Sequence, residues 1–344
     1  MKARSVLQDS ERLLSLMTGA WVSQSVYAAV RTGILDALND TSQSPGEVAA
    51  ATGCDEQAVS RLLRYLSGLG ITHRDEAAAY TATDLTRMLQ VGGAFRELVL
   101  FHGEDCYQAW AHVTTSIRTG QTGWSHAFGQ EIFEYYLTAP EKARRFDRTM
   151  AAVAELVGDE LCRAYDFSKA SEIIDIGGGN GTLLKSVLAV APTAKGTVVD
   201  RGHVVEACLR GLAGHELEQR LTAVPGDFFE AVPAGADTYL LSRILHDWDD
   251  ADCARLLNVC RNAMRPGARL LIVERVLPED GTTSLAARWD MQMLVATGGR
   301  ERTLSEYQDM LEAAGLRCQS VRPLAFGASL MVAEPIARAK PDPE

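Results

Sequence analysis

The sequence lacks three features that would assign a protein class directly. Its seven cysteines form no C-x-x-C pair, which argues against a zinc knuckle and a disulfide framework. No apolar run approaches the length of about eighteen residues that spans a bilayer. The 34 basic residues are outnumbered by 45 acidic ones, and the net charge of -11 argues against general affinity for nucleic acid or acidic membranes. These absences predict a reduced, cytoplasmic protein.

The N-terminal part has helical periodicity and then a helix-turn-helix pattern. Apolar residues from Ser10 to Leu38 predict two helices. Ser44 and Pro45 open a short helix, Asp55 caps a longer one, and Ile71–Thr83 is typical of a small β wing. A helix-turn-helix with a wing is compatible with a DNA-binding regulator.

Charge decides against DNA binding in this segment. Residues 41–89 contain four arginines, no lysine and six acids, whereas a DNA-reading module is normally basic along its recognition helix. A winged-helix module that does not bind DNA can present apolar helix faces to a second copy of itself. Homodimerisation is therefore the favoured interpretation, with the regulator as an alternative.

Residues 92–157 are again helical in spacing and are rich in aromatic side chains. For most of these residues, packing in a core explains the pattern. A segment of this kind before a cofactor domain can also grip an aromatic substrate. The candidates for that wall are Trp124, Phe128, Phe133 and Met150.

From Ser171 onward, strands alternate with helices, which predicts an α/β fold with a parallel, Rossmann-like doubly wound sheet. The predicted strands are Glu172–Ile176, Gly196–Asp200, Leu221–Pro225, Thr238–Leu245, Arg269–Val276, Gln319–Pro323 and Ala328–Ala333. Ligands of such sheets bind at the carboxyl ends of the strands.

The turn after the first of these strands, D-x-G-G-G-x-G, is the candidate ligand loop. Gly177 and Gly179 begin a dinucleotide fingerprint, but Thr182 stands where its third glycine is needed. A phosphate loop fails because Leu184 precedes Lys185. Two further strand ends fit a nucleoside. Asp200 suits a ribose diol, and Gly226, Asp227 and Phe228 offer an acid and an aromatic ring for an adenine.

The later motifs carry a family resemblance. LSRILHDWDDADCARLL (241–257), LLIVERVLPE (270–279) and MQMLVATGGRERTLSEYQDMLEAAGL (291–316) resemble the S-adenosylmethionine (SAM) dependent O-methyltransferases of the plant caffeate type and their bacterial relatives in natural-product pathways. The match covers nearly the whole chain. It implies the SAM methyltransferase fold and an α-helical, winged-helix dimerisation domain. The expected segments are 1–95 for dimerisation, 96–168 for substrate binding and 169–338 for SAM binding and catalysis.

The resemblance also implies roles for individual residues. His246 matches the general base, and Glu274 and Glu301 match the acids beside it. The positions that match the SAM site are Gly177, Asp200, Asp227 and Phe228, while Ser242 replaces the usual lysine of the plant enzymes. The acceptor pocket is expected at Trp289, Asp290, Met291 and Met293.

The chemistry fits these residue types. A phenol has a pKa near 10, so a base with a pKa of about 6.5 can take its proton as the methyl group is transferred. A carboxylate that accepts the other imidazole N–H fixes the tautomer, a role for Glu274 and Glu301 and, as a weaker candidate, Asp247. The remaining histidines show no H-E-x-x-H pattern, so no metal is expected, and His102 with Glu104 and Asp105 is interpreted as a polar surface turn.

The sequence therefore predicts a homodimeric, metal-independent enzyme that methylates a hydroxyl of a small aromatic natural product, a polyketide or antibiotic precursor. Its partners are the aromatic acceptor and a second copy, with neither nucleic acid nor membrane. A second hypothesis keeps the fold and bound SAM but diverts the reaction to hydroxylation or decarboxylation of the aromatic substrate. No residue pattern identifies the acceptor or the hydroxyl that is methylated.

Overall fold

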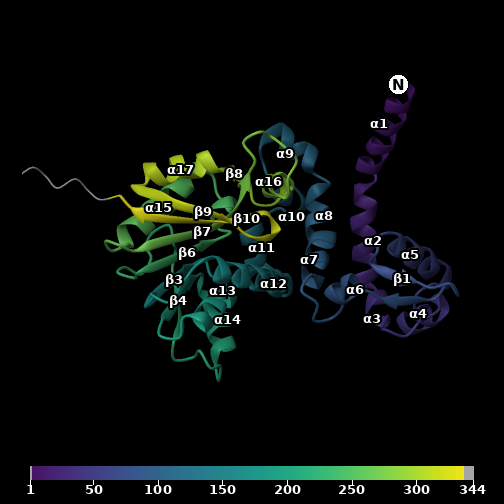
Figure 1. The fold of residues 1–344 in the computed structure, drawn as a ribbon, viewed down its shortest axis with the longest axis horizontal. Coiled ribbons are helices and arrows are strands. Elements are labelled where there is room, and N and C mark those ends of the chain that lie inside the picture. The colour runs from purple at the N-terminus through teal and green to yellow at the C-terminus, as the bar shows by residue number, and fades with distance from the viewer. Residues whose placement is uncertain (1, 337–344) are drawn as a thin grey trace, which may run out of the picture. The chain divides into compact units, whose positions relative to one another are not determined.

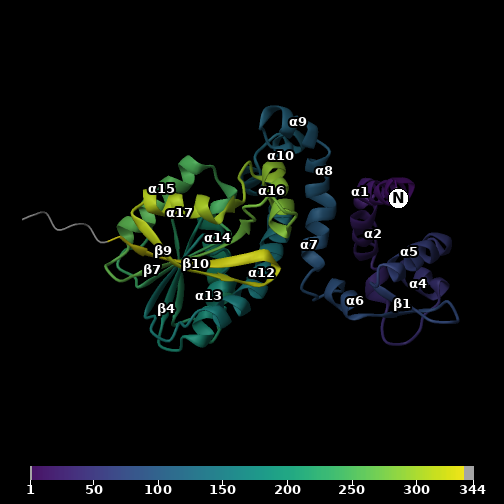
Figure 2. The ribbon, with the colours of Figure 1, turned by 45° about the horizontal axis from the view of Figure 1, so that its top comes forward.

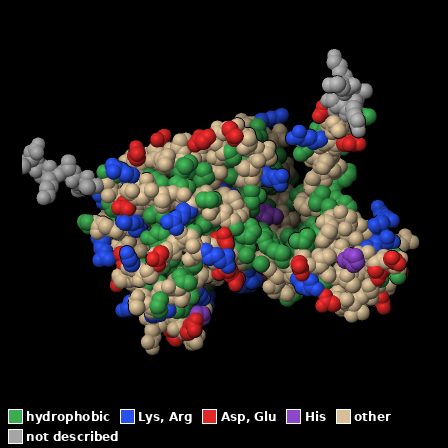
Figure 3. Space-filling model, viewed as in Figure 1, with side chains coloured by type: hydrophobic (Ala, Val, Ile, Leu, Met, Phe, Trp, Pro, Cys, Tyr) green, Lys and Arg blue, Asp and Glu red, His purple; other side chains and the backbone are tan. Residues whose placement is uncertain are grey.

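The computed structural model describes residues 2–336, in two compact units, Met1–Gln108 and Ala109–Glu344 (Figure 1). The three-segment division at residues 95 and 168 stays a prediction, and its limit at residue 338 lies outside the described residues. In this part of the chain, no single helix is long and apolar enough to cross a membrane. Only the bent pair Val6–Met17 and Gly19–Arg31 is, when its two helices are taken together, long and apolar enough. On the face drawn in Figure 3, acidic and basic side chains are interspersed.

The first unit is built mainly of helices. Its elements are α1 (Lys2–Met17), α2 (Gly19–Arg31), α3 (Ile34–Ala37), α4 (Pro45–Thr52), α5 (Glu56–Gly68), β1 (Thr72–Arg74), β2 (Tyr80–Ala82), α6 (Asp84–Leu89), α7 (Arg96–Phe101) and a π-helix (His102–Cys106). Ser44 and Glu47 form a reciprocal capping box at the start of α4, and Asp55 caps α5. The first two predicted helices are three, because Gly33 takes a φ of 76° and separates α3 from α2.

One apolar core unites the helices of this unit. Side chains of α2, α3, α4 and α5 bury one another, among them Val30, Leu35, Val48 and Leu63. The antiparallel pair β1 and β2 lies where the wing is predicted. The structure thus contains a helical N-terminal module with a small hairpin, and its description as a winged helix stays a prediction.

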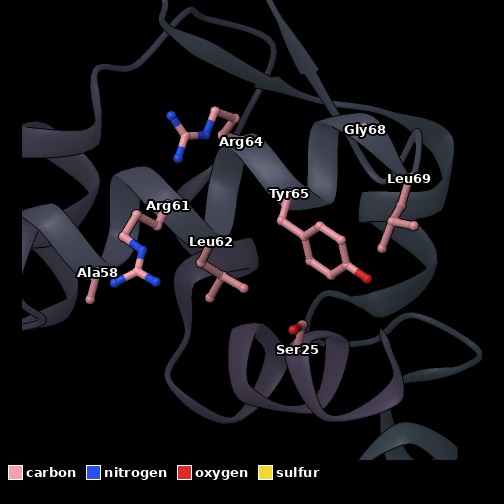
Figure 4. A pocket seen from close by; sticks show the side chains of 8 residues that line it. All are labelled: Ser25, Ala58, Arg61, Leu62, Arg64, Tyr65, Gly68 and Leu69. Atoms are coloured by element: carbon pink, nitrogen blue, oxygen red, sulfur yellow. The ribbon is translucent and has the colours of Figure 1, made fainter. Parts of the chain in front are cut away.

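The surface of the first unit retains exposed apolar side chains. Trp21, Leu14 and Met17 are each more than half exposed on α1 and α2. A shallow hollow of about 680 Å³ lies between α2 and α5, and in Figure 4 Leu62 and Tyr65 project from α5 toward Ser25 on α2. Its other lining residues are Ala58, Arg61, Arg64, Gly68 and Leu69.

The second unit begins with helices that precede the sheet. Helix α8 (Tyr107–Trp110) crosses the boundary between the units, and α9 (Val113–Thr119), α10 (Gly123–Phe128), α11 (Ile132–Thr138) and the long α12 (Pro140–Ala164) follow. Trp124 is fully buried, and its ring packs 4.7 Å from Phe128 and 5.8 Å from Tyr135, measured between centroids. This packing forms an aromatic cluster between α10 and α11.

The sheet of the second unit has the order β5-β4-β3-β6-β7-β10-β9, with β8 beside β7. Its strands are β3 (Glu172–Ile176), β4 (Lys195–Asp200), β5 (Leu221–Pro225), β6 (Thr238–Ser242), β7 (Arg269–Leu277), β8 (Arg302–Thr303), β9 (Leu316–Pro323) and β10 (Ala328–Pro335). Strands β3 to β7 are mutually parallel, as predicted. The prediction of a wholly parallel sheet is wrong at the end, where β10 runs antiparallel to β7 and β9. The short turn Ala325–Gly327 between β9 and β10 leaves no room for the crossover that a parallel pair requires.

Helices cover both faces of this sheet. Helices α12, α13 (Thr182–Val190) and α14 (Gly202–Leu212) bury one face, and α15 (Asp250–Ala263) and α17 (Leu304–Ala313) bury the other (Figure 1). Helix α16 (Leu285–Ala296) packs on β7 and lies beside α10 (Figure 2). This doubly wound arrangement brings the carboxyl ends of β3, β4, β5, β6 and β7 to one edge, where the predicted site residues lie.

Candidate active site

The glycine loop follows β3 and leads into α13. Gly177, Gly179 and Gly181 take φ values of 69°, 61° and 77°, a region that other residues adopt at a cost. A Cβ on Gly177 would lie 2.5 Å from Ile244 Cδ1. The loop therefore needs glycine both for its backbone conformation and for its close approach to the neighbouring strand end.

Asp200 ties this loop to the end of β4. Its carboxylate accepts the Gly179 N–H at 2.9 Å and the Arg201 N–H at 2.7 Å, and its carbonyl accepts the Gly226 N–H at 3.0 Å. The exposed Asp227 accepts the Phe229 N–H at 2.8 Å. The ring of Phe228 comes within 3.7 Å of a Cβ built on Gly177. The structure thus gathers the predicted cofactor residues of three strand ends around one loop.

The buried Asp175 and the half-buried Asp200 lie next to the loop. Asp175 is 1% exposed, and its Oδ2 has no hydrogen-bond partner among the described residues. Burial and the nearby Asp200 raise the pKa of Asp175 to about 8, and burial also raises the pKa of Asp200. A cationic ligand would relieve both acids. The site therefore fits SAM, which carries an ammonium and a sulfonium group, with the glycine loop and Asp200 as the residues to hold it.

The turn that carries His246 follows β6. The predicted strand Thr238–Leu245 is too long, because β6 ends at Ser242 and Arg243 takes a φ of 58°. Glu274 then accepts the N–H groups of Ile244 at 2.9 Å and Leu245 at 2.8 Å, which holds the chain in a single 3-10 turn, Leu245–Asp247. A carboxylate on the neighbouring strand thus replaces the sheet hydrogen bonds at this point.

The imidazole of His246 is oriented by two carboxylates. His246 is 2% exposed, and its Nδ1 lies 3.1 Å from Glu301 Oε1 and 3.5 Å from Glu274 Oε2. Nε2 is 3.8 Å from Asp247 Oδ1, beyond hydrogen-bond distance. Two carboxylates at Nδ1 place the proton on that atom, so the lone pair of Nε2 is left to accept another proton.

The acids also set the proton affinity of the group. Burial lowers the pKa of His246, but Glu274, Asp247 and Glu301 more than offset this and raise it to about 9. Burial raises the pKa of Glu274 to about 7, although the imidazole opposes that shift. Burial likewise raises the pKa of Asp247. In the absence of ligands, His246 is therefore mostly an imidazolium at neutral pH, with a proton on each ring nitrogen. Nε2 can accept a proton only after it has lost this one.

The sequence did not predict two residues that contact the backbone of this turn. Arg302, fully buried, donates to the carbonyls of Leu245 at 3.0 Å and Trp248 at 2.9 Å and pairs with Asp250 at 2.8 Å. A Cβ on Gly299 would lie 2.1 Å from the carbonyl oxygen of His246. Both residues belong to GGRERT (298–303), within one of the segments that carry the family resemblance.

Two further arginines were missed beside the imidazole. Arg243 approaches Met150 with Nη2 3.5 Å from the thioether sulfur. Arg275 lies 3.7 Å from Glu301 and 4.3 Å above the ring of Trp289. The only signal in the sequence was their position next to Ser242 and Glu274, because nothing in the strand pattern distinguishes an inward guanidinium from a surface one.

The predicted acceptor residues lie in several places. Met150 and the half-buried Met291 lie on α12 and α16, whereas Asp290 accepts the N–H of Glu301 at 2.9 Å and so supports the loop of Glu301. Trp124 and Phe128 belong to the aromatic cluster. A role for these residues and for Ser242 in binding stays a prediction.

Phe133 does not join the aromatic cluster of Trp124. Its ring stacks on Trp248 at 6.0 Å and lies under the guanidinium of Arg201 at 5.3 Å. Arg201 follows Asp200, so Phe133 lies toward the predicted cofactor side.

The side chains of His246 and its two carboxylate neighbours carry atoms that can bind a metal ion. Ligand atoms of His246, Glu274 and Glu301 lie within 4.8 Å of one another, a spacing that could hold an ion. The proton on Nδ1 that bonds Glu301 occupies the lone pair a metal would need, so a metal-free site stays our prediction. The interpretation of His102–Asp105 as a surface turn is wrong, because the segment forms a π-helix in which Asp105 is buried.

Comparisons with known proteins agree with this geometry. The model of the O-methyltransferase domain matches residues 110–317, and that of the O-methyltransferase dimerisation domain matches residues 14–92. The chain is 39% identical to the phenazine O-methyltransferase of Lysobacter antibioticus over 95% of this chain and 96% of that protein. It is 38% identical to the 3-amino-4-hydroxybenzoate 4-O-methyltransferase of Streptomyces cremeus, over 94% and 89% of the two chains.

A solved structure extends the comparison to the cofactor. Human N-acetylserotonin methyltransferase in complex with SAM has a TM-score of 0.88 at 27% identity, over 96% of this chain and 98% of that one. The family models, the full-length relatives and the fold point to one conclusion: the chain belongs to the O-methyltransferase family and is a SAM-dependent O-methyltransferase.

Proposed function

We propose that the enzyme methylates a hydroxyl group on a small aromatic natural product, with His246 as the general base. The observation that carries this proposal is the orientation of the imidazole, whose Nδ1 faces Glu301 and Glu274 while Nε2 hydrogen-bonds to no described residue. The relatives support the substrate class, since they are named for a phenazine and for an aminohydroxybenzoate.

The proton of the acceptor hydroxyl passes to Nε2 of His246. Once both nitrogens carry protons, the imidazolium lies against the carboxylates of Glu301 and Glu274, which stabilise its charge in a buried site. SAM, held by the glycine loop and Asp200, would supply the methyl group for the acceptor oxygen. The chain's own part is to hold the acceptor oxygen in line and to take its proton at that moment.

Glu301 is the orienting residue in this proposal, and Glu274 has two tasks. One oxygen of Glu274 holds the backbone of the His246 turn, and the other faces Nδ1. Glu301 is held in turn by Asp290, which accepts its N–H. This chain of contacts keeps the base in one tautomer and one position without a metal ion.

The quaternary state and the compartment belong to the same proposal. The N-terminal unit matches a dimerisation domain, and we expect two copies to associate through it. All seven cysteines are free thiols, which fits a reducing compartment such as the cytoplasm.

Mass spectrometry of a panel of phenolic acceptors incubated with SAM tests the function. We expect a product heavier by one methylene group, and a loss of about 10² to 10⁴ in turnover for His246→Ala. The exposed His73, on β1 of the first unit, supplies the control His73→Ala, which should retain activity. A product that gains oxygen or loses carbon dioxide instead would contradict methyl transfer and favour the diverted reactions.

A further inference from the structure

Arg243 forms no close ion pair, although the carboxylates of Asp247, Glu274 and Glu301 lie near enough to stabilise its charge through space. Its Nε is buried without a hydrogen bond, and its Nη2 touches only the sulfur of Met150 at 3.5 Å. Among the described residues, no carboxylate oxygen lies within the 4.0 Å of an ion pair with its guanidinium. Arg243 also holds a left-handed φ of 58°, which a side chain adopts at a cost in free energy. The fold therefore keeps a guanidinium with an unsatisfied Nε on a residue with strained backbone.

A second arginine lies on the adjacent strand. Arg275 is 8% exposed, and its Nε also has no hydrogen-bond partner. Its closest anion is Glu301, 3.7 Å away, and its guanidinium stacks on Trp289. Burial, together with the charge of Arg243, lowers the pKa of Arg275 to about 10. The two cations therefore lie close enough to repel each other.

The side chains of both arginines lie on the face of the sheet that α12 covers. The backbone N–H of Arg243 donates to the carbonyl of Val273 at 2.9 Å, so the two strand ends lie side by side. Arg275 follows Val273 by two residues and so shares its face, the one that α12 covers. Met150 on α12 and Trp289 on α16 border the guanidinium groups.

This arrangement suits an anion with two oxygens. A guanidinium offers its N–H donors in a planar fork that matches a carboxylate, and a buried N–H without a partner is stabilised when it gains one. A carboxylate between Arg243 and Arg275 would satisfy both Nε groups and reduce the repulsion between the cations. Glu301 Oε1 lies 3.7 Å from Arg275 and 3.1 Å from His246, so such a group lies close to the base.

We propose, on the basis of the proposed function, that Arg243 and Arg275 form a carboxylate subsite and that the acceptor is a hydroxylated aromatic acid. The ring lies between α12 and α16, with its carboxylate at the arginines and its hydroxyl at Nε2 of His246. The alternative role of the arginines is to stabilise the acceptor oxygen itself as it loses its proton. That role would not depend on a carboxylate.

Binding of matched ligand pairs tests the subsite without catalysis. Isothermal titration calorimetry of the whole protein with S-adenosylhomocysteine would compare 4-hydroxybenzoate, 3-amino-4-hydroxybenzoate and 3-hydroxy-2-naphthoate with their amides. We expect each acid that binds to do so about ten- to hundredfold more tightly than its amide, as charge-assisted hydrogen bonds imply. Equal binding of acid and amide, or failure of every acid to bind, would overturn the proposal.

Variants of the two arginines then test whether they cause the preference for acids over amides. Arg243→Met and Arg275→Met keep an unbranched apolar stem but remove the guanidinium, and they should bring acid and amide to equal affinity. Arg243→Lys should keep part of the preference. Arg288→Met, at an exposed position of α16, is the matched control and should change nothing. A variant that weakens acid and amide equally would assign the arginines to structure or to the acceptor oxygen, and would contradict a carboxylate subsite.

The two proposals fail in different ways. Methylation of neutral phenols by a protein that shows no preference for acids would leave the proposed function intact and remove the subsite. Tight binding of acids without methyl transfer to any of them would do the reverse. Thermal melting of Arg243→Met and Arg243→Lys distinguishes lost binding from lost folding.

Discussion

Nδ1 of His246 lies 3.1 Å from Oε1 of Glu301, and each of these residues is only 2% exposed. A buried imidazole so close to a carboxylate holds its proton tightly, and the pKa of His246 is raised to about 9. A base must be neutral before it can accept a proton. The contact that orients His246 therefore also limits the fraction of enzyme that is ready to react at neutral pH.

This relationship predicts the pH dependence of the reaction. We expect kcat/KM to rise with pH until about 9, as His246 loses its proton. Glu301→Gln removes the charge next to Nδ1, so the pKa of His246 should fall and the rising limb should move down by at least about one pH unit. Steady-state rates across this pH range locate the rising limb in the wild type and in Glu301→Gln.

Ionisation of the acceptor is the confounding effect in that experiment. Acceptors with different phenol pKa values should give the same limb if His246 controls it. A limb that follows the acceptor, or that Glu301→Gln leaves in place, would contradict the assignment of His246 as the titrating base.

Gly299 should be intolerant of even a methyl group. Its Cβ would lie 2.1 Å from the carbonyl oxygen of His246, so in Gly299→Ala the loop that carries Glu301 must move. We expect a loss of about 1–3 kcal/mol in the free energy of unfolding, as for overpacked cores, and a fall in kcat. Chemical denaturation and steady-state kinetics measure the two effects.

Gly211 provides the matched control for this substitution. It lies within α14, and a Cβ there would meet no heavy atom within 4 Å. Gly211→Ala should be neutral or stabilise the protein by about 0.5–1 kcal/mol, as alanine does in helices. Equal effects of the two substitutions would show that the contact between Gly299 and His246 is not decisive.

Cofactor binding should release protons near neutral pH. The pKa of Asp175 is raised to about 8 by burial and by Asp200, so at pH 7 this acid is largely protonated. A cation bound beside it favours the carboxylate, lowers the pKa and expels the proton. Titration of SAM into the protein in buffers of different ionisation enthalpy counts the released protons.

Two variants define the source of these protons. Asp175→Asn should abolish the release, whereas Asp309→Asn, an exposed acid on α17, should leave it unchanged. Proton release that survives Asp175→Asn would place the titrating acid elsewhere in the site.

The dimer should depend on the exposed apolar side chains of α1 and α2. Leu14 is 59% exposed and Trp21 is 68% exposed in a unit that matches a dimerisation domain. Leu14→Asp and Trp21→Asp place a charge in an interface that burial of apolar surface stabilises, so the monomer fraction should rise. Light scattering coupled to size-exclusion chromatography measures the mass. The control Leu209→Asp, at an exposed residue of α14, should remain dimeric, and a dimeric Trp21→Asp protein would argue for a different interface.

Several elements of the fold were predictable because their signals are local. Glycines with positive φ mark the loop after β3, and capping residues such as Ser44 and Asp55 begin helices where expected. The strand ends at Asp200 and Asp227 follow from apolar runs that stop at an acid. The direction of β10 was not predictable from such patterns, because an apolar strand has the same periodicity whether its neighbour runs parallel or antiparallel.

The sequence by itself determined the family, the order of the elements and the candidates for the base and its acids, since motif residues keep their types and spacing in the chain. Only the tertiary structure decided which groups face one another across elements. Arg302 reaches the His246 turn from β8, Asp290 holds the loop of Glu301, and Arg243 and Arg275 meet at the ends of two strands. Burial and charge act through space, so the raised pKa of His246 and the unsatisfied Nε of Arg243 exist only once the chain has folded.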